Sequence, residues 1–163
     1  MRKILTMAAC LALIATASVY AWTDDDKEEK VTLDKLPKAV LQAVKDRFPR
    51  GELGEASKET ENGKTEYEVS LKLNGSSIDV MVSPEGKLTL IEKSIHVEDL
   101  PKAVAATVKT KHPTNKITKA EEVIKVADDK ETLEYYEVIV EVDGKPVELE
   151  ILLNGKMKPE VKK

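Results

Sequence analysis

The sequence predicts an α+β protein of two tandem repeats, each a helix packed on an antiparallel β-meander of three to four strands. The main observation is an internal duplication: the segment LPKAVLQAVKDRFP at 36–49 returns as LPKAVAATVKTKHP at 100–113, an offset of 64 residues (100 − 36 = 113 − 49). Five consecutive identical residues and two prolines at a constant offset indicate a tandem repeat. The second observation is an alternation of apolar and polar residues between glycine-containing turns, which is typical of half-buried strands.

The first 21 residues have the pattern of a secretory signal peptide. A basic start precedes an apolar run from Ile4 to about Ala15, and small residues follow at possible cleavage sites after Ala17 and Ala21, of which Ala21 is favoured. The run is shorter than the ~20 residues that a membrane span needs. We therefore expect an exported protein, periplasmic or extracellular, that does not insert into a membrane once the signal peptide is removed.

Removal of this segment changes what the exported chain can do. It takes away Cys10, the only cysteine, and with it any disulfide or thiol nucleophile. It also takes away Arg2 and Lys3, which leaves 26 − 2 = 24 basic against 30 acidic residues, a net charge of −6. Because no basic stripe is visible, nucleic acid is not an expected partner.

Residues 22–30 form an acidic spacer, which contains the charge run TDDDKEEK. A segment without apolar residues is expected to remain solvated. Calcium binding by Asp24, Asp25 and Asp26 is the alternative, although these carboxylates lack the alternating spacing and the glycine of a calcium loop.

The first repeat, 31–94, is expected to open with a helix. Asp34 is the expected N-cap, Pro37 is tolerated in the first turn, and Pro49 and Gly51 end the helix. The apolar stripe at helical spacing consists of Leu36, Val40, Ala43, Val44 and Phe48.

A meander is expected to follow this helix. The alternation is weak at Glu52–Thr60 but clear at Thr65–Leu73. Asn74-Gly75 predicts a tight hairpin, because both residues tolerate positive φ. Ile78–Val82 then forms the return strand, and a further turn leads to a last strand that includes Leu88.

The second repeat, 95–163, is expected to copy this order. Its strand at Tyr136–Val142 matches Tyr67–Leu73 at an offset of 136 − 67 = 69, so five extra residues near Ala127–Glu131 lengthen a hairpin. A domain of about 65 residues is marginally stable alone. The two halves are therefore expected to share a sheet or to pack side by side.

No constellation of residues predicts catalysis. The two histidines, His96 and His112, are too few for a zinc site, which needs three or four convergent ligands. His112 replaces Phe48 just before the matching proline, where a helix C-terminus favours a cation. No serine lies in a G-x-S-x-G elbow, and the glycines fall at turns. We expect no catalytic residues, no metal site, no cofactor and no enzymatic activity.

A sheet with helices on one face leaves its other face free to bind a partner. Glu66 and Glu137 occupy outward strand positions there, which are expected to be solvated. Tyr135 stands opposite Glu66 in the alignment of the repeats, and Ile139 opposite Ser70, so two less polar residues point outward. They predict an exposed patch for a partner or a seam between the halves. The candidate partner-binding residues are Tyr135, Ile139, Glu66 and Glu137.

Several motifs together carry a family resemblance. The pattern LPKAV…FP, followed by YEVSLKLNG and SPEGKL, with YEVIVEVDGKPVELEILLNGKM as its second copy, resembles the PepSY-like domains of exported bacterial proteins, some of which are grouped with β-lactamase-inhibitor-like proteins. The resemblance covers Val31 to about Val161. It implies a helix on an antiparallel sheet, export, and a role in binding or restraining other proteins, including peptidases. It brings no catalytic residues with it.

These observations predict an exported, non-enzymatic protein-binding module that acts through the exposed sheet face, with an inhibitor-like action on a peptidase or hydrolase. The alternative is a small-ligand or calcium-binding protein of the cell envelope. The protein partner and the oligomeric state stay open.

Overall fold

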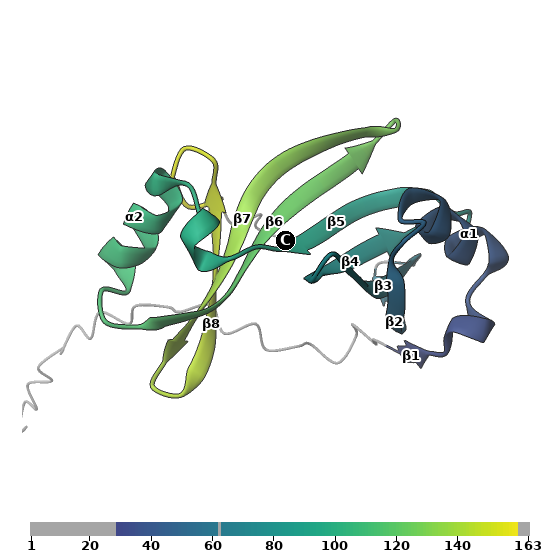
Figure 1. The fold of residues 1–163 in the computed structure, drawn as a ribbon, viewed down its shortest axis with the longest axis horizontal. Helices are drawn as coiled ribbons and strands as arrows, with labels where there is room; N and C mark the ends of the chain where they lie inside the picture. The colour runs from purple at the N-terminus through teal and green to yellow at the C-terminus, as the bar shows by residue number, and fades with distance from the viewer. Residues whose placement is uncertain (1–28, 62, 160–163) are drawn as a thin grey trace, which may run out of the picture.

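The described part of the chain forms a single antiparallel sheet of eight strands, which lie side by side in the order of the chain (Figure 1). The structure is a computed structural model that describes residues 29–61 and 63–159. The expected signal peptide and Asp24–Asp26 lie outside the described residues.

The described chain is mostly β structure. Its strands are β1 (Glu29–Val31), β2 (Glu52–Glu61), β3 (Lys64–Leu73), β4 (Ser76–Val82), β5 (Leu88–Ser94), β6 (Lys116–Ala127), β7 (Lys130–Val142) and β8 (Lys145–Leu152). Within this part of the chain, the helices are α1 (Lys38–Arg47) and α2 (Lys102–Lys111), preceded by the one-turn 3₁₀ helices η1 (Leu33–Lys35) and η2 (Val97–Asp99). The two tandem repeats are confirmed, but the sheet so dominates that the α+β expectation is met only in part.

The two repeats share one continuous sheet, which was one of the two expected arrangements. The last strand of the first repeat, β5, pairs with the first strand of the second, β6, from Leu90↔Lys125 to Ser94↔Glu121. Figure 1 shows α1 and α2 at opposite ends of the molecule. Both helices nevertheless pack on the same face of the sheet, because Ala120 and Ile124 share a face of β6 while Ala120 lies in the core under α2 and Ile124 packs against the core under α1.

The predicted apolar stripes form the two cores. Leu36, Val40, Val44 and Phe48 are buried between α1 and the sheet. In the second repeat Leu100, Val104 and Val108 are buried in the same way, but His112, the C-cap residue of α2, is only half-buried. The apolar stripe therefore ends one turn earlier in the second repeat.

The predicted helix start is wrong by one turn. Asp34 lies in η1 and caps no helix, and α1 begins only at Lys38 with Pro37 as its N-cap. The cause is local sterics, since a residue that precedes proline avoids the α region. Leu36 is accordingly extended, with ψ 145°.

The predicted hairpin turns are confirmed. Asn74 and Gly75 both have positive φ, 52° and 89°, and Asp143 and Gly144 repeat this at 51° and 74°. This is the backbone of a type I′ turn, whose twist matches that of the flanking strands. The extra residues of the second repeat lengthen the β6–β7 hairpin, as expected.

The edge of the sheet differs from the expected boundary. The last two residues of the expected spacer, Glu29 and Lys30, lie in β1 and pair with β2. β2 itself is confirmed, and a bulge between Leu53 and Ala56 explains its weak alternation. Because both residues pack on the core and lie three positions apart, the strict period of two is lost there.

Candidate functional site

One face of the sheet is covered by no helix within the described residues, since both helices pack on the other face. We call it the helix-free face. Strand alternation and the pairing registers place on it Glu66, Glu68, Ser70, Asp79, Met81, Leu90, Glu92, Ser94, Lys119, Glu121, Val123, Tyr135, Glu137, Ile139, Glu148, Glu150 and Leu152.

The structure brings three of the four predicted binding residues together. Tyr135, Glu137 and Ile139 follow one another on the helix-free face of β7. Glu66 lies on the same face of β3, which is four strands away, or roughly 19 Å at ~4.8 Å per strand. It forms an ion pair with Lys64 at 3.1 Å. Glu66 therefore belongs to a different part of the face.

Tyr135 is buried rather than exposed, with 8% of its surface accessible. Lys158 Nζ lies 3.7 Å from the centre of its ring, and Lys158 also forms an ion pair with Glu150 at 2.8 Å. Burial raises the pKa of the Tyr135 hydroxyl, and the charge and hydrogen bond of Glu150 raise it further. Tyr135 thus holds the segment after β8 against the sheet. The accessible surface on this face of β7 belongs to Glu137 and Ile139 instead.

Glu121 is the one charged residue that is fully buried within the described chain. Ser94 Oγ donates a hydrogen bond to its Oε1 at 3.0 Å, and Lys119 Nζ lies 2.8 Å from its Oε2. The alignment at Oε2 is poor for a hydrogen bond, so this contact is best described as an ion pair. The pKa of Lys119 is raised: burial acts to lower it, but the interactions with Glu121 outweigh burial.

Carboxylates face one another directly across neighbouring strands. Asp79 lies opposite Glu92, Glu121 opposite Glu137, and Glu137 opposite Glu150. Like charges at such positions repel, because the Cβ atoms are only about 5 Å apart. The expectation that the face is uniformly solvated is therefore wrong at its centre.

Burial and repulsion together raise two of these pKa values. Burial, and then the charge of Glu121, raises the pKa of Glu92 to about 7. Burial, and then the charges of Glu148 and Glu92, raises the pKa of Glu137 to about 8. Lys119 opposes both shifts without cancelling them.

The central part of this face has more acids than bases. We call the acidic cluster the carboxylates Asp79, Glu92, Glu121, Glu137, Glu148 and Glu150, whose neighbouring cations are Lys119 and Lys158. Lys119 is held by Glu121 and Lys158 by Glu150. Among residues 29–61 and 63–159, no ion pair reaches Glu92, Glu137 or Glu148.

Sequence reasoning found Glu137 but missed Glu92, Glu121 and Glu148. Their alternation marks them as outward, and nothing in a single strand shows which outward position lies at the centre of the sheet. The available signal was the pairing order, because hairpins join β6, β7 and β8, and consecutive elements such as β5 and β6 usually lie side by side.

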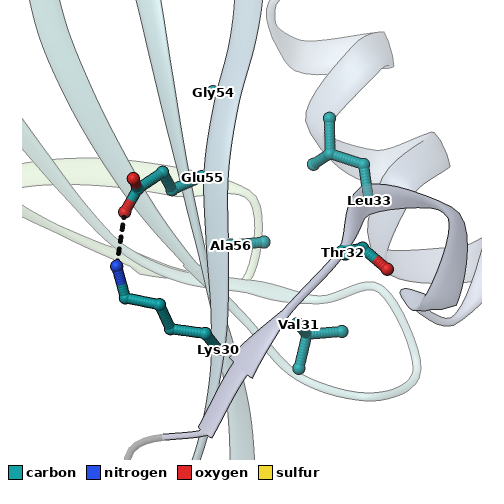
Figure 2. Close-up of a pocket in the computed structure, with 7 residues that line it drawn as sticks. All are labelled: Lys30, Val31, Thr32, Leu33, Gly54, Glu55 and Ala56. Carbon is teal, nitrogen blue, oxygen red and sulfur yellow. Dashed lines mark hydrogen bonds and ion pairs between the residues drawn. The ribbon is translucent and has the colours of Figure 1, made fainter.

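A cavity of about 430 Å³ lies at the edge of the sheet, beside β1 (Figure 2). Val31, Leu33 and Ala56 line it with apolar groups, and Lys30 and Glu55 form an ion pair at 3.1 Å on its rim. These two side chains are 80% and 82% exposed, so their pairing contributes little. The cavity has no buried polar group that would select a ligand.

The residues considered for metal binding do not converge in the described structure. His96 lies exposed before η2, and His112 lies at the end of α2. Across residues 29–61 and 63–159, no group of three or more His, Cys, Asp or Glu side chains is arranged to hold a metal ion. None of the described helices is long and apolar enough to cross a membrane.

Solved structures share this fold at low sequence identity. A BLIP-like protein from Bacteroides fragilis NCTC 9343 is 17% identical, with a TM-score of 0.55 over 76% of this chain and 83% of its own. A "putative periplasmic" protein from Bacteroides eggerthii DSM 20697 is 15% identical, with a TM-score of 0.57 over 74% and 84%. A DUF2874 family protein from Bacteroides ovatus ATCC 8483 is 13% identical, with a TM-score of 0.54 over 74% and 83%.

No curated protein matches the chain. The family model described as "Putative beta-lactamase-inhibitor-like, PepSY-like" matches it twice, over residues 20–90 and 84–158. These two matches correspond to the two tandem repeats and together span more than half of the sequence, so the chain belongs to the PepSY-like, beta-lactamase-inhibitor-like family.

Proposed function

We propose that this protein is an exported, non-enzymatic binding module of the bacterial periplasm that recognises another protein through the helix-free face. The observation that carries the proposal is the face itself: a broad part of the sheet with no covering helix, on which partly buried charged groups gather. Such groups bind a partner more strongly than fully solvated ones, because they are already partly desolvated before the partner arrives.

The family supports the same role. Its description and one structural relative carry the inhibitor-like name, and another relative is described as periplasmic. An inhibitor-like protein acts by occupying a surface of its target, which requires a rigid and accessible face rather than catalytic groups. A sheet supplies such a face, since each inner strand, β7 among them, is held on both sides by its neighbours.

The action that we propose is restraint of a peptidase or hydrolase.

Ile139 is half-buried on β7 and lies opposite Glu148 on β8. An apolar side chain beside charged ones is the usual composition of an interface that has a dry centre and a polar rim. Ile139, Glu137 and Glu148 are therefore the residues that we assign to the interface, with Tyr135 supporting them from below.

Site-specific photo-cross-linking in intact cells tests this proposal. A photoreactive residue is placed at Ile139 on the helix-free face and, as the matched control, at the exposed Lys109 on α2. The full chain is expressed so that its own leader directs export. We expect one protein to be cross-linked repeatedly from Ile139 and not from Lys109. Equal labelling from both positions, or labelling from Lys109 alone, would contradict the proposal.

Calcium or small-ligand binding is the alternative to be separated from this role. Thermal unfolding is measured with and without calcium chloride, since a ligand that binds only the native state raises the Tm. A higher Tm in calcium, together with no cross-linked protein from Ile139, would favour the alternative.

A further inference from the structure

We infer that the partner presents a basic segment, with Lys or Arg side chains that enter the acidic cluster between Glu92, Glu137 and Glu148. The inference rests on the proposed function and names the chemistry of its partner. It is argued from charge complementarity and from the geometry of the helix-free face, which together select a cationic protein segment.

The charges of the acidic cluster are not balanced. The acidic cluster holds six carboxylates against two lysines, and each lysine is already held by one carboxylate, Lys119 by Glu121 and Lys158 by Glu150. Asp79 accepts a hydrogen bond from Ser70 Oγ at 2.6 Å. Glu92 and Glu137 are left facing other carboxylates, and Glu148 lies near Glu150, so basic side chains from outside gain attraction from these glutamates.

Apolar residues lie opposite two of these three carboxylates. Glu92 on β5 lies opposite Val123 on β6, and Glu148 on β8 lies opposite Ile139 on β7. Long basic side chains bury their aliphatic stems on apolar surface while the charged head reaches a carboxylate. The half-buried Ile139 supplies that surface and the glutamates around it supply the acceptors, whereas Val123 is fully buried.

The acidic cluster can exchange protons for a bound cation. Burial and then the charges of Glu121, Glu68 and Asp79, which face Glu92, raise its pKa to about 7, and the facing Lys119 opposes this shift. Burial and then the charges of Glu148, Glu92 and Glu121 raise the pKa of Glu137 to about 8, and Lys119 opposes this shift. Glu150 lies directly opposite Glu137 on β8. Tyr135 also lies near both carboxylates. A bound cation lowers both pKa values, so binding near pH 7 to 8 must release protons.

The experiment uses titration calorimetry with the purified full chain after export. The probe is a short peptide of alternating lysine and serine, and a glutamate–serine peptide of the same length is its control. The titration is repeated in two buffers that differ in ionisation enthalpy, at a pH between about 7 and about 8. We expect the lysine peptide to bind with release of protons and the glutamate peptide not to bind.

Two double variants with the same change of net charge locate the site. Glu137→Gln with Glu148→Gln removes two carboxylates of the acidic cluster, and Asp34→Asn with Glu98→Gln removes two exposed ones in η1 and η2. The cluster variant keeps the side-chain shape and relieves repulsion, so it is expected to fold. We expect it to bind the lysine peptide about tenfold more weakly, while the control variant binds as the unmodified chain does.

The possible failures separate the two proposals. Equal weakening in both variants would show general attraction to an acidic protein and would overturn the basic-segment inference. Calcium binding that displaces the peptide from the unmodified chain but fails in the cluster variant would also overturn it, in favour of a cation site. If a partner is cross-linked from Ile139 but the lysine peptide neither binds nor competes with it, the basic-segment inference is wrong. The proposed binding function would then still hold. If no partner is cross-linked from Ile139 and the lysine peptide does not bind, both the binding function and the basic-segment inference are wrong.

Discussion

At the scale of single residues, the function of this protein depends on where a glutamate lies in the sheet rather than on its position in a strand. Glu137 and Glu141 are both outward residues of β7, yet Glu141 is exposed near the strand end and Glu137 lies between two other carboxylates. The pKa of Glu137 is raised to about 8 and that of Glu92 to about 7. These carboxylates hold protons that ordinary surface glutamates have lost.

The raised pKa values predict that stability falls as the pH rises. The ordinary pKa of 4.5 applies to the unfolded chain, so between about 4.5 and about 8 the folded state binds more protons than the unfolded state. The free energy of unfolding gained from this protonation is fully present near pH 4.5. It is lost as the pH rises past about 7, where Glu92 loses its proton, and then past about 8, where Glu137 does. Thermal unfolding followed by circular dichroism should give a lower Tm at the upper end of this window.

Variants connect this pH dependence with particular side chains. Glu92→Gln and Glu137→Gln should raise the Tm at the upper end of the window by a few degrees, since ~1 kcal/mol corresponds to about 2–4 °C in a chain of this size. They should also flatten the pH profile, whereas Glu98→Gln at an exposed position should leave it unchanged. A Tm of the unmodified chain that stays constant or rises between about pH 4.5 and about pH 8 would contradict the raised pKa values of Glu92 and Glu137.

The residues that end the two helices differ in their contribution to stability. Phe48 is 5% exposed and packs in the first core, and its ring lies 4.7 Å from the guanidinium carbon of Arg47. Phe48→Ala should cost about 3–5 kcal/mol. His112→Ala should cost much less, because that side chain is only half-buried. Urea unfolding measures both, and equal losses would mean that the two helix ends are equivalent.

At the scale of the elements, a turn presses against each helix in both repeats. Gly86 has φ 87° and lies in the turn before β5, and a Cβ atom there would lie 2.7 Å from the carbonyl oxygen of Ala39 in α1. Gly155 repeats this contact with Ala103 in α2, where Thr107 Oγ1 also donates a hydrogen bond to the Gly155 carbonyl at 2.6 Å. The close approach fixes each helix on its sheet.

Alanine substitutions separate this close approach from backbone strain alone. Gly75 and Gly144 also have positive φ, but a Cβ atom at either meets nothing within 4 Å. Gly75→Ala should therefore cost about 1 kcal/mol, the usual strain of a residue in this conformation. Gly86→Ala should cost clearly more, because α1 must move away from the sheet. Equal free energies of unfolding for the two variants would contradict the proposed contact.

The elements differ in how far the sequence predicts them, and the reasons are physical. Strands β3 and β4 and both type I′ turns follow directly from alternation and Asn-Gly or Asp-Gly pairs. β1 was missed because its three residues, Glu29–Val31, carry too short a pattern and continue a charge run. Asp34 was assigned to the wrong element because the rule for N-caps ignores the steric effect of Pro37 on Leu36. Cross-strand neighbours such as Glu121 and Glu137 require the pairing register, which no single segment contains.

At the scale of the whole molecule, the two repeats depend on each other. Ile124 and Val126 of β6 pack against the core of the first repeat, so the second repeat completes it. Arg47 of α1 also reaches Glu131 in the extended β6–β7 hairpin, with Nε–Oε1 at 2.7 Å and a second hydrogen bond at 3.0 Å. The five-residue extension that distinguishes the second repeat therefore contacts the helix of the first.

Truncation tests this dependence. A fragment of residues 31–94 would expose the edge of β5 and lose the contacts with β6. A domain of about 65 residues buries too little surface to tolerate that loss. It should show no cooperative unfolding, while the full chain should unfold in a single transition. Glu131→Gln should cost at most about 1 kcal/mol, because the ion pair is half-exposed. A cooperative transition in the fragment would mean that the repeats are separate domains.

The central claim is that the helix-free face of this combined sheet receives a basic segment of a protein partner. Photo-cross-linking from Ile139 in cells, compared between the unmodified chain and the Glu137→Gln, Glu148→Gln variant, tests it most directly. We expect one recurrent cross-linked protein whose yield is strongly reduced in the variant. A cross-linked protein that persists unchanged in the variant, or none from Ile139 while Lys109 is labelled, would contradict it.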